Sequence, residues 1–174
     1  MPSKTSLITG YTVLDVGCGT GATHEARPRG DVNVDIAPLD KGCMVENFVR
    51  ADASHLPFSD ERFDMVFCSH AFEHVWESHK TLREFFRVTR RAVVLIVPNV
   101  LYRGAHQDPT HKTYWTPYAL QLTLRCAGFR RVRVVGTKKG SWVEDSSILV
   151  RKILGALSIP FPFLAKELMV VAEK

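Results

Sequence analysis

Residues 12–21 read Thr-Val-Leu-Asp-Val-Gly-Cys-Gly-Thr-Gly, so an apolar run with one acid leads into three alternating glycines. Val13, Leu14 and Val16 can pack on both faces of a sheet, which predicts a buried parallel strand. The glycines permit a tight turn and let a ligand touch bare backbone, because no Cβ stands in the way. We expect Asp15 near the end of the strand, where an open α/β sheet presents its ligand crevice. A carboxylate there suits a ligand with a cationic group and disfavours a phosphate.

The glycine loop admits two interpretations. Gly17, Gly19 and Ala22 also satisfy the dinucleotide fingerprint G-x-G-x-x-G/A. Asp15 and the dense glycines favour S-adenosylmethionine instead, because that ligand carries a sulfonium and no phosphate. The stretch resembles the first motif of the class I S-adenosylmethionine-dependent methyltransferases. The resemblance implies that S-adenosylmethionine is the cofactor, that S-adenosylhomocysteine is the product, and that the cofactor contacts Asp15, Gly17, Cys18, Gly19 and Gly21.

Acidic residues also follow the next two predicted strands. Asp35 lies in the run 32–36, close to the spacing of about 20 residues after the glycines at which a carboxylate reaches ribose hydroxyls. The run 48–53 resembles the family's third strand, and the resemblance implies that its acid, Asp52, accepts the adenine amino group. Further cofactor contacts that the resemblance implies come from Ile36, Ala53 and Ser69.

The chain alternates predicted strands and helices, which indicates an α/β fold. Strands are predicted at 12–16, 32–36, 48–53, 63–68, 92–99, 131–135 and 167–172. Helices are predicted at 22–27, where Pro28 stops the helix, and at 77–90, 116–128 and 146–157. The family resemblance then implies a Rossmann-like three-layer sandwich, whose seven-stranded sheet is mostly parallel with an antiparallel last strand. The length predicts a single domain over 1–174.

The composition predicts a soluble, cytoplasmic protein. Hydrophobic residues make up 45% and charged residues 24% of the chain, which is ordinary for a globular domain. No apolar run is long enough to cross a bilayer, and residues 1–5 lack the apolar core of a signal peptide. The 4 cysteines form no C-x-x-C pair, which favours reduced thiols over a disulfide framework or a zinc site.

Histidines follow the fourth and fifth predicted strands, where we expect the acceptor chemistry. The first group contains His70 and the pair Glu73-His74, which resembles a Glu-His pair of small-molecule methyltransferases. The loop 102–115 carries His111 in a segment that resembles the family's Asp-Pro-x-His, and we expect this loop to cover the transferred methyl group. His111 is the first candidate for a general base, because histidine titrates near neutral pH, with His70 and His74 as alternatives. Each histidine could instead only order its loop through hydrogen bonds.

No metal site is predicted from the sequence. His106, Asp108 and His111 carry suitable donor atoms, but their spacing fits no standard ligand pattern. Cys68 lies inside an apolar run, where a free cysteine usually behaves as a small core residue rather than as a nucleophile.

The predicted function is methyl transfer to oxygen or nitrogen of a small-molecule acceptor. The fourth strand is followed neither by Asn-Pro-Pro-Tyr nor by Pro-Cys, the motifs of amino-group and cytosine methylases. The basic residues behind the net charge of +5 are concentrated in the second half of the chain, which permits RNA as a partner. No RNA-binding module accompanies them, and solvent-exposed faces of helices and strands explain these charges as well. The alternatives are an RNA or protein methyltransferase, and a non-catalytic S-adenosylmethionine-binding subunit that needs a partner. A homodimer is compatible with the sequence, and a membrane partner is not expected.

Overall fold

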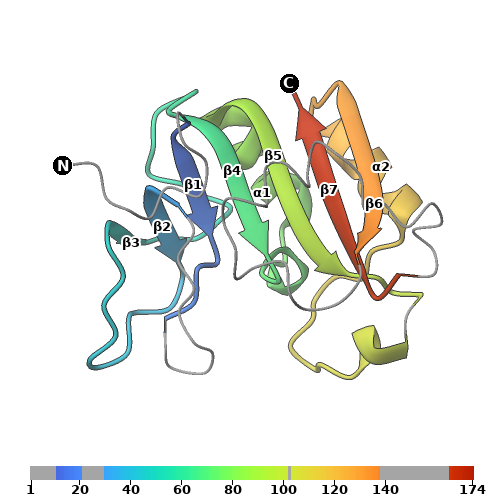
Figure 1. Ribbon diagram of the computed structural model, residues 1–174, viewed down its shortest axis with the longest axis horizontal. Helices are drawn as coiled ribbons and strands as arrows, with labels where there is room; N and C mark the ends of the chain where they lie inside the picture. Colours follow the sequence, from blue (N-terminus) through green and yellow to red (C-terminus); the bar gives the residue numbers. More distant parts are fainter. Residues whose placement is uncertain (1–10, 21–29, 102, 138–164) are drawn as a thin grey trace.

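The computed structural model describes residues 11–20, 30–101, 103–137 and 165–174 (Figure 1). Within these residues, two α-helices and two short 3-10 helices accompany the strands: α1 Ser78–Val88, α2 Pro117–Cys126, η1 Phe72–His74 and η2 Arg103–His106. The strands are β1 Val13–Val16, β2 Val32–Asp35, β3 Phe48–Arg50, β4 Phe63–Ser69, β5 Thr89–Pro98, β6 Arg131–Thr137 and β7 Glu167–Glu173.

All seven strands form one sheet in the order β3-β2-β1-β4-β5-β7-β6 (Figure 1). The pairs from β3 through β5 are parallel, and β7 runs antiparallel to both of its neighbours, β5 and β6. This topology confirms the predicted mostly parallel sheet with an antiparallel last strand. The strand order reverses between β1 and β4, and an open α/β sheet binds its ligand at such a reversal, outside the carboxyl ends of the strands.

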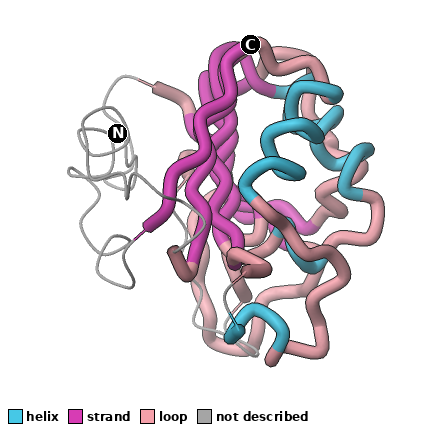
Figure 2. Tube along the Cα trace, turned by 90° about the vertical axis from the view of Figure 1, so that its right-hand side faces the viewer, coloured by secondary structure: helices cyan, strands magenta, loops and turns pink. Residues whose placement is uncertain are grey.

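The core lies between the sheet and α1 and α2, which cover the same face (Figure 2). Alternate residues of β4 point to opposite faces of the sheet. Val66 and Cys68 belong to the large cluster under the helices, and Phe67 belongs to a smaller cluster on the other face. The predicted helices 22–27 and 146–157, which a second helical layer would need, lie outside the described residues, as does Gly21. None of the described helices has the length and apolar character needed to cross a membrane.

Helix α2 begins and ends for local reasons. Thr116 caps α2, because its side-chain oxygen accepts a hydrogen bond from Ala119 N at 3.1 Å, and Pro117 occupies the first turn. Gly128, just past α2, has a φ of +115°, as a helix-terminating glycine often does. Helix α1 ends at Val88, so the predicted limit at residue 90 is wrong, and Thr89 already belongs to β5.

The largest differences between the predicted and observed strand boundaries are at β5 and β3. The Thr89 hydroxyl donates to the carbonyls of Asp64 and Ala92 at 3.1 and 3.0 Å, which holds the residue in β5 and lengthens that strand at its start. The third strand is shorter than the predicted 48–53, because β3 ends at Arg50. Asp52 therefore follows the strand in a turn, where its carboxylate accepts a hydrogen bond from Ser54 N at 2.8 Å.

Candidate functional site

The loop after β1 folds over the end of β2. The backbone N–H groups of Gly17 and Cys18 both donate to the carbonyl of Val34, at 2.8 and 3.1 Å. Gly17 and Gly19 each have a φ of +80°, a conformation that glycine adopts without a steric penalty. Gly19 N then donates to Asp35 Oδ2 at 3.0 Å, so the carboxylate at the end of β2 orders the glycine loop directly.

Gly17 also touches the loop that follows β4. A Cβ on Gly17 would lie 2.1 Å from the Cβ of Ala71, which is far inside van der Waals contact. Ala71 immediately follows His70 and precedes η1. The glycine loop and the first group of predicted catalytic residues are therefore in direct contact at the point where the strand order reverses.

Two carboxylates and an exposed apolar side chain line the ends of β2 and β3. Asp35 pairs in register with Arg50, and Asp52 comes two residues further along the chain. Ile36 is 65% exposed, which is unusual for a large apolar side chain. Hydrogen bonding from Ser54 N holds the pKa of Asp52 below its usual range, so Asp52 is an acceptor at neutral pH. This combination suits a nucleoside, whose hydroxyl and amino groups donate and whose ring is apolar.

His70 lies between two carboxylates at the carboxyl end of β4. Its Nδ1 is 3.5 Å from Glu73 Oε1, and its Nε2 is 3.6 Å from Glu167 Oε1. The backbone of His70 has a φ of +53°, which a non-glycine residue seldom adopts outside constrained and functional positions. Its side chain remains 45% exposed, so a substrate can reach it.

Glu167 was not identified from the sequence. It is the first residue of β7 and pairs in register with Pro98, the last residue of β5. Because β7 runs antiparallel, its beginning lies at the edge where the parallel strands end (Figure 1). Glu73 was recognised only as part of a Glu-His pair, and the structure adds that its side chain is buried beside His70.

The loop after β5 is fastened to η1. The N–H groups of Lys112 and Thr113 donate to the carbonyl of Glu73 at 2.8 and 3.0 Å. The ring of Trp115 stacks on Phe72 with centroids 5.2 Å apart, and Val100 N donates to the Trp115 carbonyl at 3.0 Å. These contacts place the loop against the end of β4, as the sequence predicted for its position, while its role as a lid stays a prediction.

The predicted histidines gather at one edge of the sheet. The rings of His74 and His111 meet edge to face with centroids 4.9 Å apart, and both lie near Glu73. His111 Nδ1 is 3.0 Å from the carbonyl of Ala105, and its side chain is only 9% exposed. His106 instead bonds the Val100 carbonyl through Nε2 at 2.9 Å and stacks on Tyr114.

The two buried thiols are poor nucleophiles. Burial and the neighbouring carboxylates raise the pKa of Cys18 to about 12, and burial raises the pKa of Cys68 well above its ordinary value. Because the thiolate is the reactive form, these residues should stay unmodified at neutral and mildly alkaline pH, and Cys18 should gain reactivity only as the pH nears its raised pKa. We expect iodoacetamide to modify the exposed Cys126 first, as measured by mass spectrometry.

The denatured chain, in which all thiols are accessible, is the control for that measurement. Modification of Cys18 in the native protein at the rate of Cys126 would contradict the assignment.

Comparison with known proteins identifies the class of domain. Residues 14–97 match the family described as a methyltransferase domain. The chain is 36% identical over 125 residues to a demethylmenaquinone methyltransferase of Renibacterium salmoninarum, covering 66% of this chain and 49% of the relative. It is 28% identical over 183 residues to the norajmaline N-methyltransferase of Rauvolfia serpentina, covering 89% of this chain and 59% of the relative.

The solved structure of an S-adenosylmethionine-dependent methyltransferase from Thermotoga maritima has the same fold. It superposes with a TM-score of 0.66 at 16% identity, over 97% of this chain and 84% of that one. Residues 14–97 thus match a methyltransferase domain, and the chain has the fold of S-adenosylmethionine-dependent methyltransferases. S-adenosylmethionine is the cofactor that this class of domain implies, as the glycine loop predicted. The chain spans about half the length, or less, of the first curated relatives that it matches.

Proposed function

We propose that this domain transfers the methyl group of S-adenosylmethionine to oxygen or nitrogen of a small-molecule acceptor. The observation that carries the proposal is the contact between Gly17 and Ala71, because it sets the cofactor loop directly beside His70. The names of the two relatives above describe methylation of demethylmenaquinone and N-methylation of norajmaline, which supports a small-molecule acceptor.

The residues present fit S-adenosylmethionine. Asp35 has carboxylate oxygens at the end of β2 that can accept the ribose hydroxyls while Gly19 N remains bonded to Oδ2. The exposed side chain of Ile36 would pack on the adenine ring, with Asp52 accepting from the adenine amino group. Of the remaining predicted contacts, Cys18 and Gly19 belong to the glycine loop, Ala53 follows β3, and Ser69 is the last residue of β4.

The cofactor supplies a methyl group that its sulfonium already activates, so the protein mainly orients the acceptor and excludes water. We propose that His70, rather than His111, accepts the proton that the methyl acceptor loses. His70 is the more exposed of the two side chains, and Glu73 and Glu167 flank its ring nitrogens and stabilise the protonated form. His74 is the last residue of η1, and His111 lies in the loop after β5.

Replacing His70 with asparagine tests this assignment. Asparagine tolerates a positive φ better than most residues, so the backbone should be preserved while the proton acceptor is removed. We expect the rate of methyl transfer to fall by about 10²-fold or more, with the affinity for S-adenosylhomocysteine nearly unchanged. The measurement is formation of S-adenosylhomocysteine with a panel of hydroquinones, phenols and amines as acceptors.

His79→Asn is the matched control, because His79 is exposed on α1 and has no part in the site. An unchanged transfer rate in His70→Asn would contradict the assignment of the proton acceptor. Transfer to RNA or to a peptide with none to the panel would contradict the small-molecule proposal, and cofactor binding without transfer to any acceptor would favour a non-catalytic subunit.

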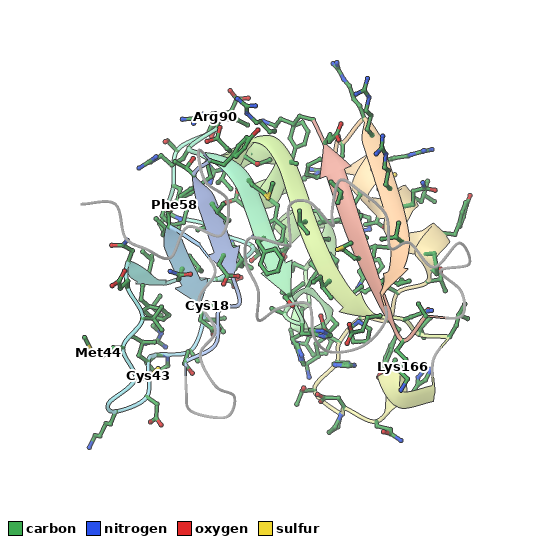
Figure 3. The ribbon with its side chains drawn as sticks, in the orientation of Figure 1. Cys18, Cys43, Met44, Phe58, Arg90 and Lys166 are labelled. Atoms are coloured by element: carbon green, nitrogen blue, oxygen red, sulfur yellow. The ribbon has the colours of Figure 1, made fainter. Side chains whose placement is uncertain are left out.

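Three arginines at the starts of β5 and β6 give little support to an RNA acceptor. Arg90 and Arg91 lie at the start of β5 and form ion pairs with Asp64 at 3.6 and 3.5 Å. Arg131 starts β6 and pairs with Glu173 at 3.7 Å. These residues occupy the amino-terminal edge of the parallel strands, and Figure 3 shows Arg90 at the opposite end of the sheet from Cys18. A strand of RNA bound there would be held away from the cofactor loop.

A further inference from the structure

Three side chains that ligate metals well converge beside the candidate acceptor site. Glu73, His74 and His111 each offer a donor atom, and these atoms all lie within 4.8 Å of one another. Glu73 and His74 belong to η1, and His111 comes from the loop after β5. The set differs from the His106, Asp108 and His111 group considered in the sequence, because Glu73 and His74 are distant from that group along the chain.

The hydrogen bonds of both histidines select the tautomer that binds a metal. A carbonyl oxygen can only accept, so the 3.0 Å contact of His111 Nδ1 with the Ala105 carbonyl places the proton on Nδ1. The 3.3 Å contact of His74 Nδ1 with the Thr110 carbonyl does the same for His74. In both rings Nε2 then carries the lone pair. Metal-binding histidines usually donate their other ring N–H to a carbonyl or carboxylate in this way.

The carboxylate of Glu73 provides the second, independent observation. Its residue is 1% exposed, and neither carboxylate oxygen has a hydrogen-bond partner in the described part of the chain. His70 Nδ1, at 3.5 Å from Oε1, is in ion-pair range but does not form a hydrogen bond. A buried carboxylate without hydrogen bonds is costly unless a cation neutralises it, and the donor atoms of His74 and His111 lie within 4.8 Å of a Glu73 oxygen.

We infer that Glu73, His74 and His111 bind a divalent transition-metal ion, with Zn²⁺ as the best match to two imidazoles and one carboxylate. Tetrahedral ligands about 2.1 Å from a metal lie about 3.4 Å apart, so donor atoms that are within 4.8 Å of one another need to approach by up to about 1.4 Å when an ion binds. Asp108 Oδ2, at 3.7 Å from His111 Nε2, is near enough to supply a fourth donor. The ion would fasten the loop after β5 to η1, in addition to the backbone bonds on the Glu73 carbonyl. The inference does not depend on the methyl acceptor.

Titration of the metal-free protein with Co²⁺ tests the site, because cobalt replaces zinc and its visible absorption reports the ligand geometry. We expect one equivalent to bind with the absorption of a tetrahedral or five-coordinate site, and Zn²⁺ to displace it. His74→Asn, His111→Asn and Glu73→Gln should each weaken binding by at least about tenfold. His79→Asn should bind as the wild type does, because His79 is exposed on α1.

Glu73→Gln keeps the shape of the buried side chain, and circular dichroism of each variant shows whether it is folded. Absence of stoichiometric Co²⁺ binding to the wild type would overturn the inference. Binding that persists unchanged in folded Glu73→Gln and His74→Asn would overturn it as well, because the metal would then occupy other residues.

Discussion

Replacing Asp35 with alanine is expected to weaken binding of S-adenosylhomocysteine by about 10²–10⁴-fold. The variant would lose two charge-assisted hydrogen bonds to the ribose, each contributing about 1.5–3 kcal/mol, and every 1.4 kcal/mol corresponds to about tenfold in affinity. Asp35 also accepts from Gly19 N and Ala37 N at 3.0 and 3.1 Å, so its removal should loosen the glycine loop in the same direction. Isothermal titration calorimetry measures the change.

Asp60→Ala is the control for the loss of one carboxylate, because Asp60 precedes β4 at the opposite edge of the sheet and pairs with Arg87. Equal affinity of wild type and Asp35→Ala would exclude Asp35 from the cofactor site. Tighter binding of NAD than of S-adenosylhomocysteine would contradict the interpretation of the whole glycine loop.

Gly17→Ala is expected to destabilise the fold by about 2–5 kcal/mol, measured as the free energy of unfolding in urea. A φ of +80° costs an alanine about 1–2 kcal/mol, and the collision with the Cβ of Ala71 adds about 1–3 kcal/mol of overpacking. Gly42→Ala separates the two contributions. Gly42 has a φ of +83° but nothing within 4 Å of an added Cβ, so it should show only the backbone cost.

The double variant Gly17→Ala with Ala71→Gly should recover the part of the loss that comes from the collision. Equal destabilisation in Gly17→Ala and Gly42→Ala would show that the contact with Ala71 has no energetic consequence. The structure thus adds the contact with Ala71 to the tight turn and the ligand approach, which were the reasons for Gly17 that the sequence offered.

The sheet was predictable because its strands are marked locally. β-Branched runs such as 92–97 can only be buried on both faces of a parallel sheet, and each is bounded by turn residues or helical spacing. Asp35 was predictable for a similar reason, since it stands at a fixed spacing from the glycines along the chain. The exact ends of elements were less predictable, and the transition from α1 to β5 at Thr89 depends on hydrogen bonds to Asp64 and Ala92.

The acceptor side of the site could be predicted only in part. His70 and His111 follow strands and so were expected at the carboxyl edge. Glu167 reaches His70 through the register of an antiparallel strand almost a hundred residues away, and no local pattern encodes that register. The contact between the rings of His74 and His111 likewise depends on backbone hydrogen bonds from the loop after β5 to the Glu73 carbonyl. The amino-acid sequence gives no local sign of these bonds.

The position of β7 also determines the order in which the sheet can assemble. β6 precedes β7 in the chain, yet in the described sheet it pairs with β7 and not with β5. β6, with α2 before it, can therefore join the sheet only when β7 has paired with β5. Pairing over such long sequence separations is slow relative to local contacts. The glycine loop and its carboxylates involve only β1 and β2, whereas the carboxylate of Glu167 can reach His70 only once β7 has paired with β5.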